Sequence, residues 1–127
     1  MNSLDANVVL RYILHDIPDQ FRRSEVLING SPCYVSDVIV TEVVYVLEKL
    51  MDVPRSNIAL ILRKFLALET INCNDQLLME VIDLFEAKRT LSFSDCYAAV
   101  EAKRSENNLA TFDKELIRHG GEHVTAP

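Results

Sequence analysis

Four short segments of the sequence each place a carboxylate beside an apolar run. They are Leu4-Asp5-Ala6-Asn7, Val40-Thr41-Glu42-Val43, Phe93-Ser94-Asp95-Cys96 and Ala110-Thr111-Phe112-Asp113. None of these segments contains a basic residue. Carboxylate oxygens are the ligands that a hard divalent cation such as Mg²⁺ or Mn²⁺ prefers. If the four acids converge in the fold, they would form a metal pocket suited to phosphodiester chemistry.

Each acid also has a simpler interpretation. Asp5 and Asp113 directly precede predicted helices, where an aspartate can accept hydrogen bonds from free backbone N–H groups, and Asn7 could cap the first helix equally well. Glu42 shares a helical stripe with other polar residues, so a solvated side chain explains it. From local pattern alone, both the structural and the chemical interpretation of these residues stay open.

Asp95 differs from the other acids because its helical neighbours are small and apolar. Ala98, Ala99 and Ala102 follow it at helical spacing, and a face of this kind should pack inward. A carboxylate on that face must cap the helix, be paired, or bind a cation, since burying an unpaired charge is costly.

The elements that would position these acids follow an alternating order. Short apolar runs predict strands at 1–4, 33–35, 70–73, 109–112 and 123–125, and stretches of helical period separate them. The predicted helices cover 8–14, 18–29, 37–51, 54–68, 75–85, a segment from 94 or 95 onward, and 113–118. This order predicts an α/β fold with a central, mostly parallel sheet of four to five strands and helices on both faces.

Length and charge limit the classes of function. The 127 residues fit one domain, with 49% hydrophobic residues and a net charge of −6 from 13 basic and 19 acidic residues. This sign of charge disfavours a protein that holds nucleic acid by general phosphate attraction. The objection weakens if the acids bind a cation, and a basic partner protein would also account for the charge.

The cysteines and histidines do not indicate a metal site of their own. Cys33, Cys73 and Cys96 form no C-x-x-C pair, and His119 and His123 are separated by two glycines. We expect the cysteines to be small buried residues. Because no apolar run approaches the roughly 18 residues of a membrane span and no leader pattern is present, we expect a cytoplasmic protein without membrane contact.

At the four acidic segments the chain resembles the PIN-domain ribonucleases, and within them the VapC-type toxins of prokaryotic toxin–antitoxin pairs. The resemblance rests on Leu4-Asp5-Ala6-Asn7-Val8-Val9-Leu10-Arg11-Tyr12, Val40-Thr41-Glu42-Val43, Phe93-Ser94-Asp95-Cys96-Tyr97-Ala98-Ala99 and Leu109-Ala110-Thr111-Phe112-Asp113. It implies a PIN-like three-layer sandwich over residues 1–127. The departures from the family pattern are Ala6, where a hydroxyl residue is common, and the polar Ser3 in the first strand.

The resemblance also implies an activity. Asp5, Glu42, Asp95 and Asp113 would bind Mg²⁺ or Mn²⁺ and catalyse cleavage of single-stranded or loop RNA by activated water, with Asn7 and Thr111 in support. The expected partners are the RNA substrate, a VapB-like antitoxin with a basic segment, and a second copy of the chain in a homodimer.

Two other functions remain open at this stage. The first is a PIN-fold nuclease of RNA processing or decay, and the second is a catalytically inactive α/β binding module whose acids only cap helices. The apolar helices at 54–68 and 75–85 have two interpretations as well, either as a surface for a dimer or antitoxin or as ordinary core.

Overall fold

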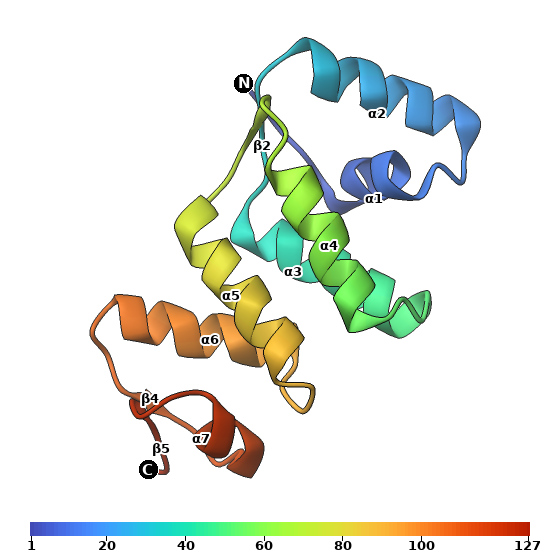
Figure 1. The fold of residues 1–127 in the computed structure, drawn as a ribbon. Coiled ribbons are helices and arrows are strands. Elements are labelled where there is room, and N and C mark those ends of the chain that lie inside the picture. The colour runs from blue at the N-terminus through green and yellow to red at the C-terminus, as the bar shows by residue number, and fades with distance from the viewer. The chain divides into compact units, whose positions relative to one another are not determined.

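The computed structural model describes all residues, 1–127, and shows two compact units, Met1–Asp75 and Gln76–Pro127 (Figure 1). The chain contains seven α-helices, one π-helix and five short strands. Every pair of strands is parallel, which confirms the predicted α/β class. No helix has the length and apolarity that a membrane span requires.

The first unit is built around a three-stranded sheet. Its elements are β1 (Asn2–Ser3), α1 (Ala6–Leu14), α2 (Pro18–Gly30), β2 (Cys33–Tyr34), α3 (Asp37–Tyr45), the π-helix η1 (Val46–Leu50), α4 (Arg55–Leu66) and β3 (Ile71–Asn72). The strand order is β1-β2-β3, and Asn2 pairs with Cys33, which pairs with Ile71. This register aligns the carboxyl ends of the strands, so Asp5, Ser36 and Cys73 follow them at one edge.

Helix packing supplies most of the core of the first unit. The fully buried side chains include Ile28 of α2, Val43 of α3 and Ile58 of α4. Tyr12 of α1 packs against Phe65 of α4 with ring centroids 5.7 Å apart, an edge-to-face geometry. Since each strand contributes only two residues to its ladder, this packing holds α1 and α3 in place beside the sheet.

The second unit combines three helices with a two-stranded ladder. It contains α5 (Asp75–Ala87), which starts at the boundary, followed by α6 (Phe93–Arg104), β4 (Leu109–Ala110), α7 (Lys114–His119) and β5 (Val124–Thr125). Leu109 pairs with Val124 in parallel. The five strands thus match the predicted number, in ladders of three and two strands.

Several element boundaries differ from the prediction. The helix predicted to run from 37 to 51 ends as α-helix at Tyr45 and continues as a π-helix, in which one turn accommodates an extra residue. Helix α6 begins at Phe93 instead of Ser94 or Asp95, because Ser92 caps it. The predicted strands are shortened to two residues each.

Burial bears on two further expectations. Most apolar residues of α4 and α5 lie in the core, which supports the core interpretation of these helices. Leu60 and Ala87 are exposed, Ile61, Met79 and Leu84 are half-buried, and a role of the helices as a dimer or antitoxin surface stays a prediction. Cys33 and Cys96 are buried and Cys73 is half-buried, and all three are free thiols.

Candidate active site

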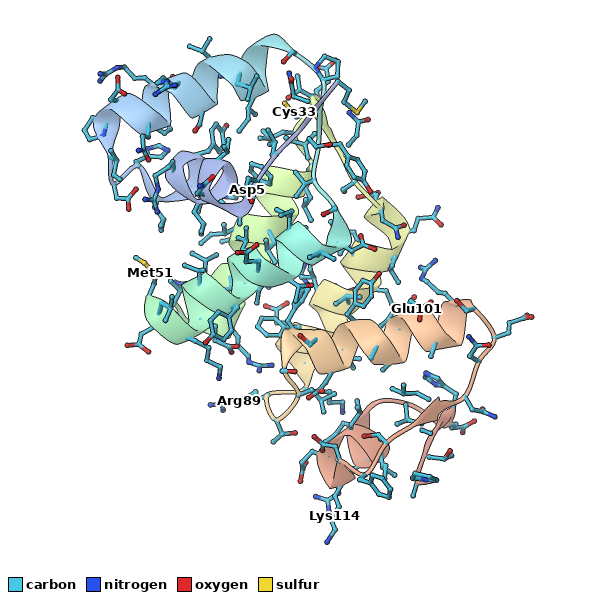
Figure 2. All side chains as sticks on the ribbon, turned by 180° about the vertical axis from the view of Figure 1, so that it is seen from behind. Asp5, Cys33, Met51, Arg89, Glu101 and Lys114 are labelled. Carbon is cyan, nitrogen blue, oxygen red and sulfur yellow. The ribbon has the colours of Figure 1, made fainter.

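Asp5 lies where β1 passes into α1 (Figure 2). The Leu4 N–H donates to the Tyr34 carbonyl at 2.9 Å, which continues the sheet as far as the residue before Asp5. Asp5 then caps α1, and its Oδ1 accepts the Ala6 N–H at 2.9 Å. Its Oδ2 makes no hydrogen bond, and the residue is exposed. The predicted capping role is confirmed, and it occupies only one carboxylate oxygen.

Glu42 lies in the middle of α3 on its exposed face. The helix starts at the carboxyl end of β2, where the Ser36 hydroxyl accepts the Ile39 N–H at 3.3 Å. Helix α3 packs against α1, the helix that Asp5 caps. Glu42 has neither a hydrogen bond nor an ion pair, so no structural role explains its carboxylate.

Asp95 is the third residue of α6 and belongs to a capping box. The Ser92 hydroxyl accepts the Asp95 N–H at 3.0 Å, and Asp95 Oδ2 accepts the Ser92 N–H at 3.2 Å. Ser92 was missed as a functional residue by the sequence reasoning, although the Ser-x-x-Asp spacing is the signal of such a box. The reciprocal bonds fix the Asp95 carboxylate and leave its Oδ1 without a hydrogen bond.

Asp113 caps α7 through one oxygen. Its Oδ1 accepts the N–H groups of Glu115 at 2.9 Å and Leu116 at 3.1 Å, while Oδ2 makes no hydrogen bond. Thr111 holds the turn, because its Oγ1 accepts the Asp113 N–H at 3.0 Å and its own N–H donates to the Thr125 carbonyl. Thr111 therefore positions Asp113 through the backbone.

The starts of α6 and α7 are tied together in the second unit. Thr90, two residues before the cap of α6, donates its hydroxyl to Glu115 Oε2 at 3.2 Å. Glu115 is in the first turn of α7, just after Asp113. This bond holds the loop that precedes Asp95 against the helix that Asp113 caps.

Two properties of these acids suit a cation, one of the three aspartates and one of all four acids. Each aspartate uses one oxygen for its own helix and keeps the other unbonded, and none of the four acids forms an ion pair. Some other acids of the chain are paired: Glu48 lies 2.9 Å from Arg55, and Glu80 lies 3.1 Å from Arg104. Exposed, unpaired carboxylate oxygens are the donor chemistry that Mg²⁺ or Mn²⁺ requires.

The acids are divided equally between the two units. Asp5 and Glu42 belong to the first unit, and Asp95 and Asp113 belong to the second. Neither unit by itself gathers three or more metal-ligating side chains. That all four acids bind one ion therefore stays a prediction.

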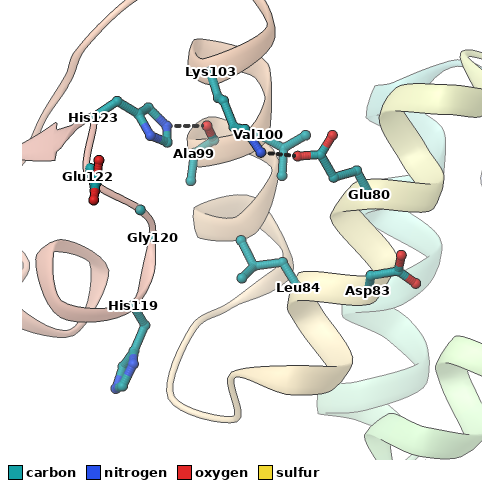
Figure 3. A pocket seen from close by; sticks show the side chains of 11 residues that line it. Glu80, Asp83, Leu84, Ala99, Val100, Lys103, His119, Gly120, Glu122 and His123 are labelled. Atoms are coloured by element: carbon teal, nitrogen blue, oxygen red, sulfur yellow. Dashed lines mark hydrogen bonds and ion pairs between the residues drawn. The ribbon is translucent and has the colours of Figure 1, made fainter.

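A cavity of about 670 Å³ in the second unit involves none of the four acids (Figure 3). At its wall Lys103 Nζ lies 3.2 Å from Glu80 Oε2, and His123 Nε2 lies 2.6 Å from the Ala99 carbonyl. His119, which also lines it, pairs with Glu115 at 3.5 Å. Both histidines therefore have protein partners.

Cys73 follows β3 at the carboxyl edge of the first unit's sheet, the edge that Asp5 also follows. Partial burial raises the pKa of its thiol, and the negative charges of Asp75 and then Asp37 raise it further. The thiol is thus kept protonated near neutral pH, which disfavours a nucleophilic role.

The chain is thus an α/β domain with parallel strands, in which Asp5, Asp95 and Asp113 lie at the starts of helices. A comparison with protein families matches the PIN domain over residues 3–122, a range that covers most of each unit and all four acids. The chain belongs to the PIN-domain family, whose members are generally nucleases. No curated protein matches the chain.

Proposed function

We propose that the protein is a Mg²⁺- or Mn²⁺-dependent endoribonuclease that cuts single-stranded or loop RNA. Asp5, Glu42, Asp95 and Asp113 are the proposed metal ligands and catalytic residues. The observation that carries the proposal is the state of these carboxylates, which are unpaired and have unbonded oxygens although helix caps orient three of them. A divalent ion bound there would activate water and offset the charge that develops on the phosphate.

The residues of the chain prepare this site before any ligand binds. The caps of α1, α6 and α7 fix the aspartates in one orientation, so little reorganisation is needed when the free oxygens take up a cation. Thr111 fixes the backbone of Asp113, and Ser92 fixes the carboxylate of Asp95. Ala6 contributes no hydroxyl, so Asp5 is held by the backbone of α1 alone.

The direct test is cleavage of labelled single-stranded RNA with Mg²⁺, with Mn²⁺ and with a chelator. Native protein should cut only with metal. Asp95→Asn should abolish cleavage and keep the fold, because the asparagine oxygen can still accept the Ser92 N–H. The matched control is Glu122→Gln, an exposed acid of the same unit without a partner, which should retain activity. Metal-independent cleavage would overturn the proposal.

We further propose that this nuclease is a VapC-type toxin held inactive by a VapB-like antitoxin, and that it acts as a homodimer. The net charge of −6 supports a basic partner. The protein should arrest growth when it is expressed without its genomic neighbour, and co-expression should relieve the arrest. Metal-dependent cleavage without growth arrest would instead favour a nuclease of RNA processing or decay.

A second candidate, an inactive α/β binding module, is supported by the three capping aspartates. Helix capping alone would account for Asp5, Asp95 and Asp113, though it leaves Glu42 unexplained. Calorimetric titration with Mn²⁺ separates the two candidates. An absence of metal binding would favour the binding module.

A further inference from the structure

The first unit contains a pocket between α1 and α2, of about 380 Å³, that the metal site does not explain. Its polar lining consists of Asn7 and Arg11 from α1 and of Gln20, Arg23 and Ser24 from α2. The two helices pack side by side (Figure 1). No acidic side chain lines this pocket, although acids outnumber bases in the chain.

Ser24 is the one buried polar side chain of the protein, with 6% of its surface exposed. Its hydroxyl makes no hydrogen bond within the protein, and the oxygen itself stays accessible in the pocket that Ser24 lines. A hydroxyl can donate a hydrogen bond, so Ser24 offers a donor to a ligand with oxygen atoms. The buried nitrogen of this lining that lacks a hydrogen bond is Arg11 Nε.

The two arginines of the pocket, Arg11 and Arg23, have hydrogen-bond donors that can bind the same ligand. Arg11 Nε is buried and makes no hydrogen bond, although Asp16 Oδ1 lies 3.2 Å from it as an ion-pair partner. Arg23 lies 3.9 Å from Asp19, which Arg22 approaches at 3.8 Å, so one carboxylate serves two guanidinium groups. With side chains 66–80% exposed, such ion pairs are weak and leave Arg23 available.

The chemistry of this lining selects an anion with several acceptor oxygens. Guanidinium, hydroxyl and amide groups are all hydrogen-bond donors, and arginine matches the geometry of phosphate well. The pocket also lies close to the candidate metal site along the chain, because Asn7 stands two residues after Asp5 on the helix that Asp5 caps.

We propose that this pocket binds a backbone phosphate of the RNA strand, one that is not cleaved. The proposal rests on the ribonuclease function proposed above and gives it a positioning subsite. It also explains how an acidic protein holds RNA, since a local cluster of donors replaces general phosphate attraction. Contacts of this kind are independent of base sequence.

The test measures binding of a labelled single-stranded RNA to the full chain, with chelator present, over a range of salt concentrations. Arg23→Gln should weaken binding roughly 5-fold at about 100 mM salt, and should reduce the salt slope by about 0.7. Ser24→Ala should weaken binding without changing the slope, since the hydroxyl is neutral. Arg22→Gln is the matched control, because Arg22 shares Asp19 with Arg23 but does not line the pocket.

Thermal unfolding of each variant accompanies the binding data. Ser24→Ala should be as stable as the native protein or more stable, because the hydroxyl makes no hydrogen bond within the protein and alanine is the better helix former inside α2. Three results of the RNA measurement would overturn the proposal: equal losses of affinity for Arg22→Gln and Arg23→Gln, unchanged affinity for Ser24→Ala, or no RNA binding by the native protein. The proposal would also be overturned if the variants lost affinity for an acidic peptide and retained their affinity for RNA.

The two proposals fail in distinguishable ways. Binding is measured without metal, so pocket-dependent binding by a protein that never cuts RNA would sustain the pocket and refute the nuclease. Metal-dependent cleavage, with equal RNA affinities of Arg22→Gln and Arg23→Gln, would support the nuclease proposal and refute the proposed phosphate pocket.

Discussion

The two units place their candidate acids in different structural settings. In the first unit the Asp5 carboxylate accepts one hydrogen bond, and the Glu42 carboxylate accepts none. In the second unit Asp95 belongs to a reciprocal capping box, and Asp113 accepts two backbone N–H groups. The acids of the second unit therefore contribute to folding in a way that Glu42 does not.

This difference shows how structural and chemical roles can share one side chain. A carboxylate has two oxygens, so a helix cap on one oxygen leaves the other for a ligand. Loss of activity after substitution in the second unit can thus reflect a lost cap or a lost ligand. In the first unit, Glu42 isolates the chemical role.

The largest effect is expected at Glu42. Glu42→Gln should lower metal-dependent RNA cleavage by roughly 100-fold or more if the carboxylate contributes to the metal site. The free energy of unfolding should change by less than about 0.5 kcal/mol, because the side chain is exposed and unbonded. Initial rates and thermal melts measure the two quantities. The control is Glu69→Gln, an exposed and unpaired acid of the same unit. Retained cleavage would remove Glu42 from the site.

An intermediate effect is expected at Asp113, where two substitutions separate the roles. Asp113→Ala should destabilise the protein by about 1 kcal/mol, since two N–H groups of α7 lose their acceptor. Asp113→Asn should keep most of that stability because its amide oxygen can still cap the helix. Both variants should lose cleavage. Urea unfolding makes the comparison, and equal stability of the two variants would mean that the cap contributes little.

The smallest effect is expected at Cys73. Folding raises the pKa of the Cys73 thiol above its ordinary value of 9.0. The contribution of the protonated thiol to the free energy of unfolding is therefore fully present below that value, and it is lost as the pH rises through the higher pKa of the folded state. The stability difference between the native protein and Cys73→Ala should therefore shrink as the pH is raised from about 8 to about 10. Thermal melts over this range measure it, and a difference that grows with pH would contradict the assignment.

Local sequence pattern predicted the parts of the fold that local forces decide. The buried stripes of α4 and α5 follow helical spacing, and Asp5 and Asp113 could be identified as caps because each directly precedes a predicted helix. At α6 two serines compete for the cap, and the choice of Ser92 over Ser94 depends on the reciprocal bond with Asp95. The start of this helix was therefore misplaced.

The remaining features depend on contacts between distant segments. The π-helix at Val46–Leu50 has no distinctive local pattern. The Thr90 bond to Glu115 and the unbonded hydroxyl of Ser24 arise only when separate elements pack together. The hydrogen bonding of the four acids is a further feature of this kind. The sequence identifies these residues, but it does not specify which of their carboxylate oxygens remain without a hydrogen bond.

The register of the three-stranded sheet has a consequence for the order of events during synthesis. In the first unit Asn2 pairs with Cys33, and Cys33 pairs with Ile71. The sequence separation between Leu109 and its partner Val124 in the second unit is much shorter. Closing long loops before contacts form slows folding, and domains fold as their segments leave the ribosome. The three-stranded sheet should therefore close more slowly than the two-stranded ladder, because its pairings join residues much farther apart in the chain.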